Sequence, residues 1–190
     1  MESKIVYFEK PGVENTEEVL RIVRQRAEEL GIKTVVVAST TGKTAVRAMD
    51  VFHGLRVVVV THSAGFKEPN TQEFTKENKK IVEGKGGIIL TTTHAFGGLS
   101  RATHRKHNMT VLGEVLADTL RIFSQGLKVA CEVSMMAVDS GLVRTDEDVI
   151  AIAGTGGEGR GADTAIVLKP VNTHDFFDLK IKEILCKPHF

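Results

Sequence analysis

Short, continuous runs of β-branched residues recur along the chain, and stretches with the apolar spacing of amphipathic helices lie between most of them. The clearest runs are 34–37, 56–60 and 149–152, in which valine and isoleucine dominate. A continuous apolar run is typical of a strand that is covered on both faces. Because strands that alternate with helices pair in parallel through crossover connections, the sequence predicts an α/β fold, a three-layer αβα sandwich around a mostly parallel sheet.

One pair of expected strands breaks this alternation. Only the glycine-rich segment 154–161 separates the strand at 149–152 from the strand at 165–168. This segment is too short for the crossover of about a dozen residues or more that a parallel pair requires. These two strands are therefore expected to pair antiparallel, which gives the sheet one antiparallel strand.

Local signals place the remaining elements. Asn15 with Glu18, and Asn70 with Glu73, have the spacing of capping boxes, in which two side chains satisfy the first amides of a helix. The polar stretch 91–108 is too long for a plain connection and is expected to be a functional loop. The expected strands cover 5–8, 34–37, 56–60, 88–90, 149–152, 165–168 and 179–185, and the expected helices cover 15–30, 42–52, 70–82, 112–123 and 129–138, with Gly126 and Gly141 ending the last two.

Length and composition limit the class of protein. With 190 residues and a mass of 20.7 kDa, the chain suits a single domain over 1–190. The 25 basic and 24 acidic residues leave a formal net charge of +1 and no broad positive surface for nucleic acid. Cys131 and Cys186 lack disulfide or zinc spacing. No apolar run reaches the roughly 18 residues of a membrane span, and no signal peptide is visible. We therefore expect a cytoplasmic protein with no nucleic-acid or membrane partner.

Four expected parallel strands end in segments rich in glycine, hydroxyl groups and histidine. These segments are 38–44, 61–66, 91–98 and 154–161. In open α/β sheets, ligands bind at the carboxyl ends of the strands. Because the carboxyl ends of parallel strands lie along one edge, we expect the four segments to form a rim whose amides and side-chain donors suit an anionic ligand.

The turn 39–44, Ser-Thr-Thr-Gly-Lys-Thr, has the strongest signal for a phosphate. It leads from a strand directly into a helix, so that backbone amides, the helix dipole and hydroxyl groups converge on one place. The turn is not the P-loop of nucleotide triphosphatases, because that motif needs a glycine where this chain has Val37. The alternative interpretation is that Ser39 or Thr40 only caps the helix and that Gly42 eases the turn.

The other strand-end segments offer further contacts. The loop 154–161 opens a strand rather than a helix, so it is not a dinucleotide fingerprint. It is either a flexible hairpin loop or a flap over a ligand, with Arg160 as a counter-charge. His62 and His94 are expected to form hydrogen bonds with a ligand, the alternative being loop residues of no special role. No metal site is expected, because no metal-ligand spacing accompanies them.

Charged residues also occur outside the strand ends. Arg101, Arg105, Lys106 and His107 form a basic patch, which is expected to be a solvated or subunit-facing surface, with phosphate contact as the alternative. Glu132 lies in an otherwise apolar helical pattern and is expected on its polar edge, with a buried catalytic carboxylate as the alternative. No nucleophile and base pair can be assigned from the sequence.

Two parts of the sequence resemble the C-terminal α/β domain of pyruvate kinases. The first is 34–45, TVVVASTTGKTA, followed one helix later by 55–61, LRVVVVT. The second is 148–154, DVIAIAG, followed by the glycine-rich loop and 163–170, DTAIVLKP. The resemblance covers about 15–172, with an N-terminal and a C-terminal strand added, and it points to the stand-alone, largely archaeal relatives of that domain.

The resemblance implies the same αβα fold and a function in binding. In the kinases, the turn that matches 39–44 holds a phosphate of an allosteric sugar phosphate, and the loop that matches 154–161 closes over it. This loop lacks the tryptophan of the kinases, which argues against a sugar bisphosphate. The catalytic barrel has no counterpart, so no pyruvate kinase activity is expected. For the stand-alone relatives the implied ligand is flavin mononucleotide (FMN), with its ring system toward Phe66, His94 or Phe96.

The sequence therefore supports three hypotheses. The first is a binding protein for a phosphorylated small molecule, FMN above all, which occurs alone or as a homo-oligomer. The second is a flavin-dependent or phosphate-ester-handling enzyme that uses His62 or His94, and the third is a regulatory or subunit-interaction module with a vestigial effector site. The candidate ligand-binding residues are Ser39, Thr40, Thr41, Gly42, Lys43, Thr44, His62, Ser63, Gly65, Phe66, His94, Phe96, Gly154, Thr155, Gly156, Arg160, Gly161 and Asp163.

Overall fold

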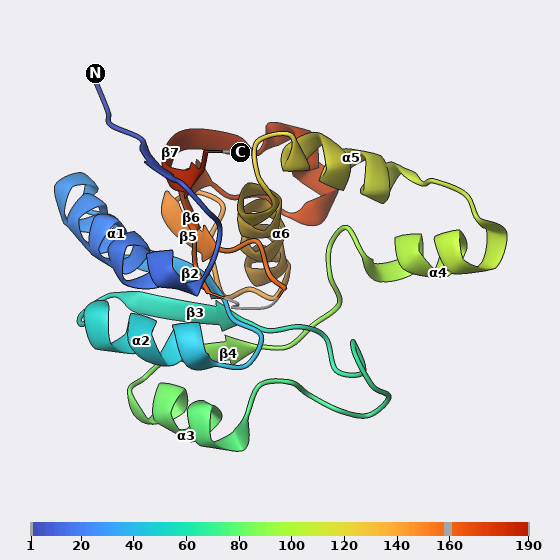
Figure 1. The fold of residues 1–190 in the computed structure, drawn as a ribbon, viewed down its shortest axis with the longest axis horizontal. Coiled ribbons are helices and arrows are strands. Elements are labelled where there is room, and N and C mark those ends of the chain that lie inside the picture. Colours follow the sequence, from blue (N-terminus) through green and yellow to red (C-terminus); the bar gives the residue numbers. More distant parts are fainter. Residues whose placement is uncertain (1, 158–160, 190) are drawn as a thin grey trace.

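One sheet runs through the molecule, and the computed structural model describes it within residues 2–157 and 161–189 (Figure 1). In these residues the strand order is β1-β7-β6-β5-β2-β3-β4. The strands are β1 (Val6–Phe8), β2 (Thr34–Ala38), β3 (Arg56–Val60), β4 (Ile88–Leu90), β5 (Val149–Ala153), β6 (Thr164–Lys169) and β7 (Lys180–Pro188).

Strand direction follows the sequence-based expectation. β2 pairs in parallel with both β3 and β5, and β3 pairs in parallel with β4. β6 runs antiparallel to both of its neighbours, β5 and β7, so the prediction of one antiparallel strand is confirmed. The two added strands also meet, since β1 pairs in parallel with β7 at one end of the sheet. The carboxyl ends of β2, β3, β4 and β5 therefore lie along the same edge.

Helices cover both faces of this sheet. α1, α2 and α3 pack on one face, and α6 packs on the other, with α5 against α6 (Figure 1). α4 lies farther out and contacts α5. This arrangement is the three-layer αβα sandwich that the alternation predicts. The helices are α1 (Thr16–Leu30), α2 (Lys43–Val51), α3 (Lys76–Gly84), α4 (Gly98–His107), α5 (Leu112–Arg121) and α6 (Gln125–Asp139), with short 3₁₀ turns at Val13–Asn15 and Thr173–Asp178.

Continuous valine runs serve both faces because successive side chains of a strand point in opposite directions. In β2, Val35 and Val37 pack in the cluster formed with α1 and α2, whereas Val36 packs in the cluster formed with α6. α6 is buried along almost its whole length, from Gly126 to Val138. This burial fits the almost entirely apolar pattern of residues 129–138.

Both predicted capping boxes are wrong. Asn15 ends a 3₁₀ turn and already has helical backbone angles, so its side chain donates to the carbonyl of Lys10 instead of capping α1. The helix expected from residue 70 begins at Lys76, where the Thr75 hydroxyl accepts from the amide of Asn78. In both cases a local turn preceding the helix competes with the capping-box geometry.

Two further expectations need correction. The stretch 91–108 is not a loop throughout, because α4 occupies its second half. Gly126 does not end a helix: it lies in the first turn of α6, which Ser124 caps by accepting from the amide of Leu127. A Cβ atom at Gly126 would lie 2.2 Å from the Thr164 hydroxyl oxygen, so close packing against β6 explains the glycine. Gly141 follows α6 with a positive φ of 69°, as expected of a helix stop.

Within the described residues, no helix combines the length and the apolar character that crossing a membrane requires.

Candidate functional site

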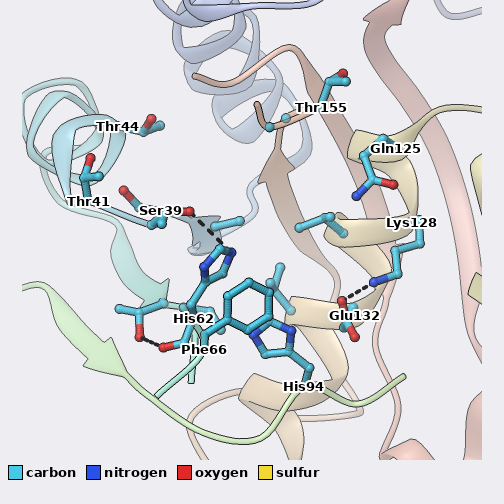
Figure 2. Close-up of a pocket in the computed structure, with 18 of the residues that line it drawn as sticks. Ser39, Thr41, Thr44, His62, Phe66, His94, Gln125, Lys128, Glu132 and Thr155 are labelled. Atoms are coloured by element: carbon cyan, nitrogen blue, oxygen red, sulfur yellow. Dashed lines mark hydrogen bonds and ion pairs between the residues drawn. The ribbon is translucent and has the colours of Figure 1, made fainter. Parts of the chain in front are cut away.

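A pocket lies at the carboxyl edge of the sheet, and all four strand-end segments contribute to its walls (Figure 2). Its volume is about 240 Å³. Ser39, Thr41 and Thr44 lie on one side, Gln125 and Lys128 of α6 on the other, and the rings of His62, Phe66 and His94 between them. The convergence expected from parallel strands is confirmed, and we call this cavity the rim pocket.

The start of α3 holds the turn between β2 and α2 in place. The carbonyl of Thr41 accepts hydrogen bonds from the amide of Thr75 and from the side chain of Asn78. Gly42 has φ +95°, and a Cβ atom there would lie 2.5 Å from Cβ of Asn78. Gly42 is therefore required both by its left-handed backbone and by the close approach of α3.

The hydroxyl groups of this turn have two different roles. Ser39 is buried, and its hydroxyl accepts from the amide of Ala45 at 3.3 Å, so the capping interpretation holds for this residue. Thr41, Thr44 and Lys43 line the rim pocket, and their side chains have no hydrogen-bond or ion-pair partner among the described residues. Their donors remain available to a ligand.

The backbone of the same turn offers a row of donors. Within the described part of the chain, the amide groups of residues 40–44 have no acceptor, whereas the next amide, that of Ala45, is capped by Ser39. Successive free amides at the start of a helix, where the dipole is positive, form an anion site. We call residues 40–44 the phosphate cradle.

His62 faces the cradle from the end of β3. Its Nδ1 atom lies 2.7 Å from Oε2 of Glu73, and its Nε2 atom lies 3.5 Å from the hydroxyl oxygen of Thr40. Because a carboxylate only accepts, Nδ1 of His62 carries a proton, and Nε2 is the ring nitrogen that faces the pocket. The Phe66 ring packs on the imidazole with a centroid distance of 4.1 Å.

His94 is neutral at physiological pH. Burial lowers its pKa to about 4; the nearby Glu132 charge opposes this shift, and Arg101 and His62 add to it. Its Nε2 atom accepts from the amide of Ser63 at 3.4 Å, which fits an unprotonated ring nitrogen. The Phe66 ring stacks on His94. The guanidinium group of Arg101, a residue of α4, lies 4.5 Å from the centroid of the Phe66 ring.

A buried ion pair forms the opposite wall. Nζ of Lys128 lies 2.5 Å from Oε2 of Glu132, and the two side chains are only 7% and 5% exposed. The other carboxylate oxygen accepts from the amide of Phe96 at 2.9 Å. The expectation that Glu132 lies on a polar edge is wrong, because α6 is covered on all sides and Lys128, one turn earlier, neutralises the carboxylate.

Several predicted site residues lie elsewhere. Phe96 is buried in a cluster with Ala117, Met135 and Val171 and does not line the rim pocket, and Ser63 and Gly65 are also outside its walls. Arg160 lies outside the described residues. The predicted residues that line the pocket are Ser39, Thr40, Thr41, Lys43, Thr44, His62, Phe66, His94, Gly154, Thr155, Gly156 and Gly161, while Gly42 shapes the cradle backbone.

The ends of the glycine-rich loop meet above β5 and β6. A Cβ atom at Gly154 would lie 1.9 Å from the carbonyl oxygen of Gly161. The Asp163 carboxylate accepts from the amide of Thr155 and from the hydroxyl of Thr164, so this predicted ligand residue anchors the loop instead of lining the pocket. The two ends of this loop therefore have the form of a hairpin connection between β5 and β6, which was one of the two interpretations of the sequence.

Sequence reasoning missed the side chains that reach the pocket from other elements. Arg121 and Gln125, which line the pocket, lie where a helix was expected to end. Glu73, which the sequence pattern placed in a helix cap, does not line the pocket itself but contacts its residue His62. Lys128 offered a signal, since a lysine inside an apolar helical pattern needs a buried partner. Among the described residues, no three histidine, cysteine or acidic side chains come together as metal ligands.

A comparison with known proteins finds a family model that matches most of this chain. The family model described as "Pyruvate kinase, alpha/beta domain" matches residues 17–168. A crystal structure of a pyruvate kinase from Cryptosporidium parvum is similar to this chain with a TM-score of 0.41 and 12% sequence identity. The match covers 82% of this chain and 23% of the kinase chain, so the chain spans less than a quarter of that kinase's length.

Proposed function

The chain belongs to the pyruvate kinase alpha/beta domain family, and on that premise we propose that it binds a phosphorylated small molecule, FMN above all, in the rim pocket. The observation that supports this most is the phosphate cradle, in which a row of free backbone amides lies together with the side chains of Thr41, Lys43 and Thr44. A phosphate there would accept from the amides and hydroxyls and would pair with the ammonium group of Lys43. The proposal concerns the binding of a ligand and includes no pyruvate kinase activity.

The rest of the rim pocket suits a flat, polar ring system. Phe66 and His94 supply aromatic faces, and Gln125 and Lys128 supply donors for ring carbonyl oxygens. At about 240 Å³ the pocket is smaller than most sites for ligands of this size. We therefore expect FMN binding to widen the pocket, and Phe66, on the loop 64–71, is the wall residue expected to shift.

Reversing the charge at Lys43 is expected to weaken FMN binding by roughly ten- to a hundredfold, because a carboxylate would then face the phosphate. Lys33→Glu is the matched control: this exposed lysine precedes β2 at the amino edge of the sheet. Calorimetric titration of wild type, Lys43→Glu and Lys33→Glu measures the effect. Equal losses of FMN affinity in the two variants, or no loss in either, would contradict binding of the phosphate in the cradle.

His62 supports a second candidate, an enzyme that acts on the bound ligand. A histidine oriented by a carboxylate, with its other nitrogen toward a hydroxyl group and a ligand pocket, is the usual arrangement of a general base. The low pKa of His94 makes it a poor proton donor at neutral pH, so His62 is the better choice of the two. In this function Glu73 holds the tautomer and stabilises the imidazolium that forms when Nε2 takes a proton.

His62→Gln is expected to lower turnover by about 100-fold or more, and Glu73→Gln to lower it less. The assays are FMN reduction by NADH or NADPH and phosphate release from FMN or 4-nitrophenyl phosphate. Affinity for inorganic phosphate, measured by calorimetry, serves as the control and should change little in Glu73→Gln. A wild-type protein that binds inorganic phosphate but turns over none of these compounds would exclude the enzyme.

A further inference from the structure

Phe66 lies among the rings of the rim pocket although it belongs to an exposed loop. Its ring centroid is 4.1 Å from that of His62 and 5.0 Å from that of His94, and the ring planes are inclined by 36° and 28°. Figure 2 shows the three rings together in the middle of the pocket. The position in which a flat ring can stack on both imidazoles is therefore taken by a side chain of the protein itself.

The loop 64–71 reaches into the pocket with this side chain alone. In this stretch, all of which the structure describes, Phe66 is half-buried and every other residue is exposed. The amide of Gly65 donates to the carbonyl of Thr71 at 2.8 Å, which closes the loop at its base. Apart from the ring contacts of Phe66, no side chain of the loop has a hydrogen bond or ion pair to another part of the described chain. The loop can therefore move outward as a unit once Phe66 leaves its neighbours.

Arg101 joins this loop to a second exposed segment, the helix α4. Its guanidinium group lies 4.5 Å from the centroid of the Phe66 ring and has no acidic partner among the described residues. α4 itself buries no residue. A single cation–π contact at an exposed site is weak and can break and re-form readily. We call this interaction the Phe66–Arg101 contact.

The two imidazoles keep their positions without Phe66. Nδ1 of His62 is held by the Glu73 carboxylate at 2.7 Å, and Nε2 of His94 accepts from the amide of Ser63 at 3.4 Å. Burial lowers the pKa of His94 to about 4, so its ring is uncharged at neutral pH. The departure of Phe66 would therefore leave two stacking surfaces in place for another flat ring.

We propose that Phe66 occupies the binding site of an aromatic ring of the ligand, and that the Phe66–Arg101 contact holds it there until such a ring replaces it. This inference rests on the proposed function and adds the class of ligand, a phosphorylated compound with a flat aromatic ring rather than a sugar phosphate. The incoming ring stacks on His62 and His94, while Phe66 moves outward with its loop and covers that ring from outside. A phosphorylated ligand without a ring leaves the Phe66–Arg101 contact intact.

Fluorescence quenching tests the Phe66–Arg101 contact without any ligand. The chain contains no tryptophan, so Phe66→Trp introduces a single fluorophore, which acrylamide should quench only weakly in the closed pocket. Adding Arg101→Gln should raise the quenching constant roughly two- to fivefold, the effect of losing one cation–π contact. Arg105→Gln, one turn farther along α4 and also exposed, is the control and should change nothing. Quenching of Phe66→Trp as strong as that of free indole, or no effect of Arg101→Gln, would overturn the contact.

Binding kinetics test the replacement of Phe66 by a ligand ring. FMN should associate with Phe66→Ala about tenfold faster than with the wild type, because the ring site is then open in every molecule instead of in a minor fraction. It should also dissociate faster, since the outer cover is lost. Ribose 5-phosphate, which has the phosphate but no aromatic ring, is the control ligand, and its affinity by calorimetry should be equal for both proteins.

The outcomes separate this inference from the proposed function. Association of FMN that is unchanged or slower in Phe66→Ala would overturn the replacement and leave Phe66 as a fixed wall of the pocket. A wild-type protein that binds ribose 5-phosphate as tightly as FMN would overturn the ligand class while supporting the phosphate cradle. Binding of neither compound would refute the proposed function and the ligand class with it, and the quenching result would still decide the Phe66–Arg101 contact.

Discussion

Glu132→Gln is expected to lower the free energy of unfolding by about 3–5 kcal/mol, because it leaves the buried ammonium group of Lys128 without its counter-charge. Both side chains are almost fully covered, and Glu132 also anchors the amide of Phe96 at the start of the segment that leads to α4. The loss should be visible as a lower midpoint in urea unfolding with a similar slope.

An exposed pair provides the matched control. Lys79 and Glu83 in α3 have the same four-residue spacing and the same order along the helix, but both are more than half exposed. Glu83→Gln should therefore cost about 0.5 kcal/mol or less. The double variant Lys128→Met, Glu132→Met should recover much of the stability, since it removes both buried charges. A Glu132→Gln loss as small as that of Glu83→Gln would contradict the buried ion pair.

Gly42→Ala is expected to cost roughly 2–4 kcal/mol of stability and to weaken binding of a phosphorylated ligand at least about tenfold. The left-handed backbone at this position costs a non-glycine residue about 1–2 kcal/mol, and crowding adds a similar amount. The new Cβ atom would meet Asn78 at 2.5 Å and the Phe74 ring at 2.9 Å. Relief of these contacts would move α3 or the turn, and the amides of the phosphate cradle would no longer converge.

Gly31→Ala separates the two contributions to this loss. Gly31 ends α1 with φ +67°, and a Cβ atom there would meet nothing within 4 Å. Its substitution should therefore cost only the conformational part and should leave ligand affinity unchanged. Thermal unfolding and calorimetric titration of the two variants measure both effects. Equal losses of stability would show that α3 does not press on Gly42.

The sheet and the location of the rim pocket could be predicted because they depend on local patterns. Runs such as 34–37 and 56–60 specify buried strands whatever their neighbours are, and parallel pairing then brings their carboxyl ends together. The short segment 154–161 was enough to predict the antiparallel pair β5 and β6. These inferences need no knowledge of contacts between distant residues.

The roles of individual side chains could not be predicted in full, because they depend on tertiary contacts. Glu73 has the spacing of a helix cap, but the chain turns so that its carboxylate reaches His62 eleven residues earlier. For Ser39 the sequence left a ligand contact and a helix cap open, and only the structure shows that the residue lines the rim pocket while its hydroxyl accepts from the amide of Ala45. Glu132 looks like the polar edge of α6 because only the packing of α5 and the strands shows that this helix has no exposed side.

A titration of the wild-type protein with FMN and with riboflavin tests the central proposal most directly, because the two ligands share the ring system and differ in the phosphate. Binding through the phosphate cradle predicts that FMN binds about 100-fold more tightly than riboflavin, the size of effect that a few charge-assisted hydrogen bonds supply. Changes in flavin absorbance and fluorescence report both affinities. Equal affinity for the two ligands, or no binding of FMN by the folded protein, would contradict it.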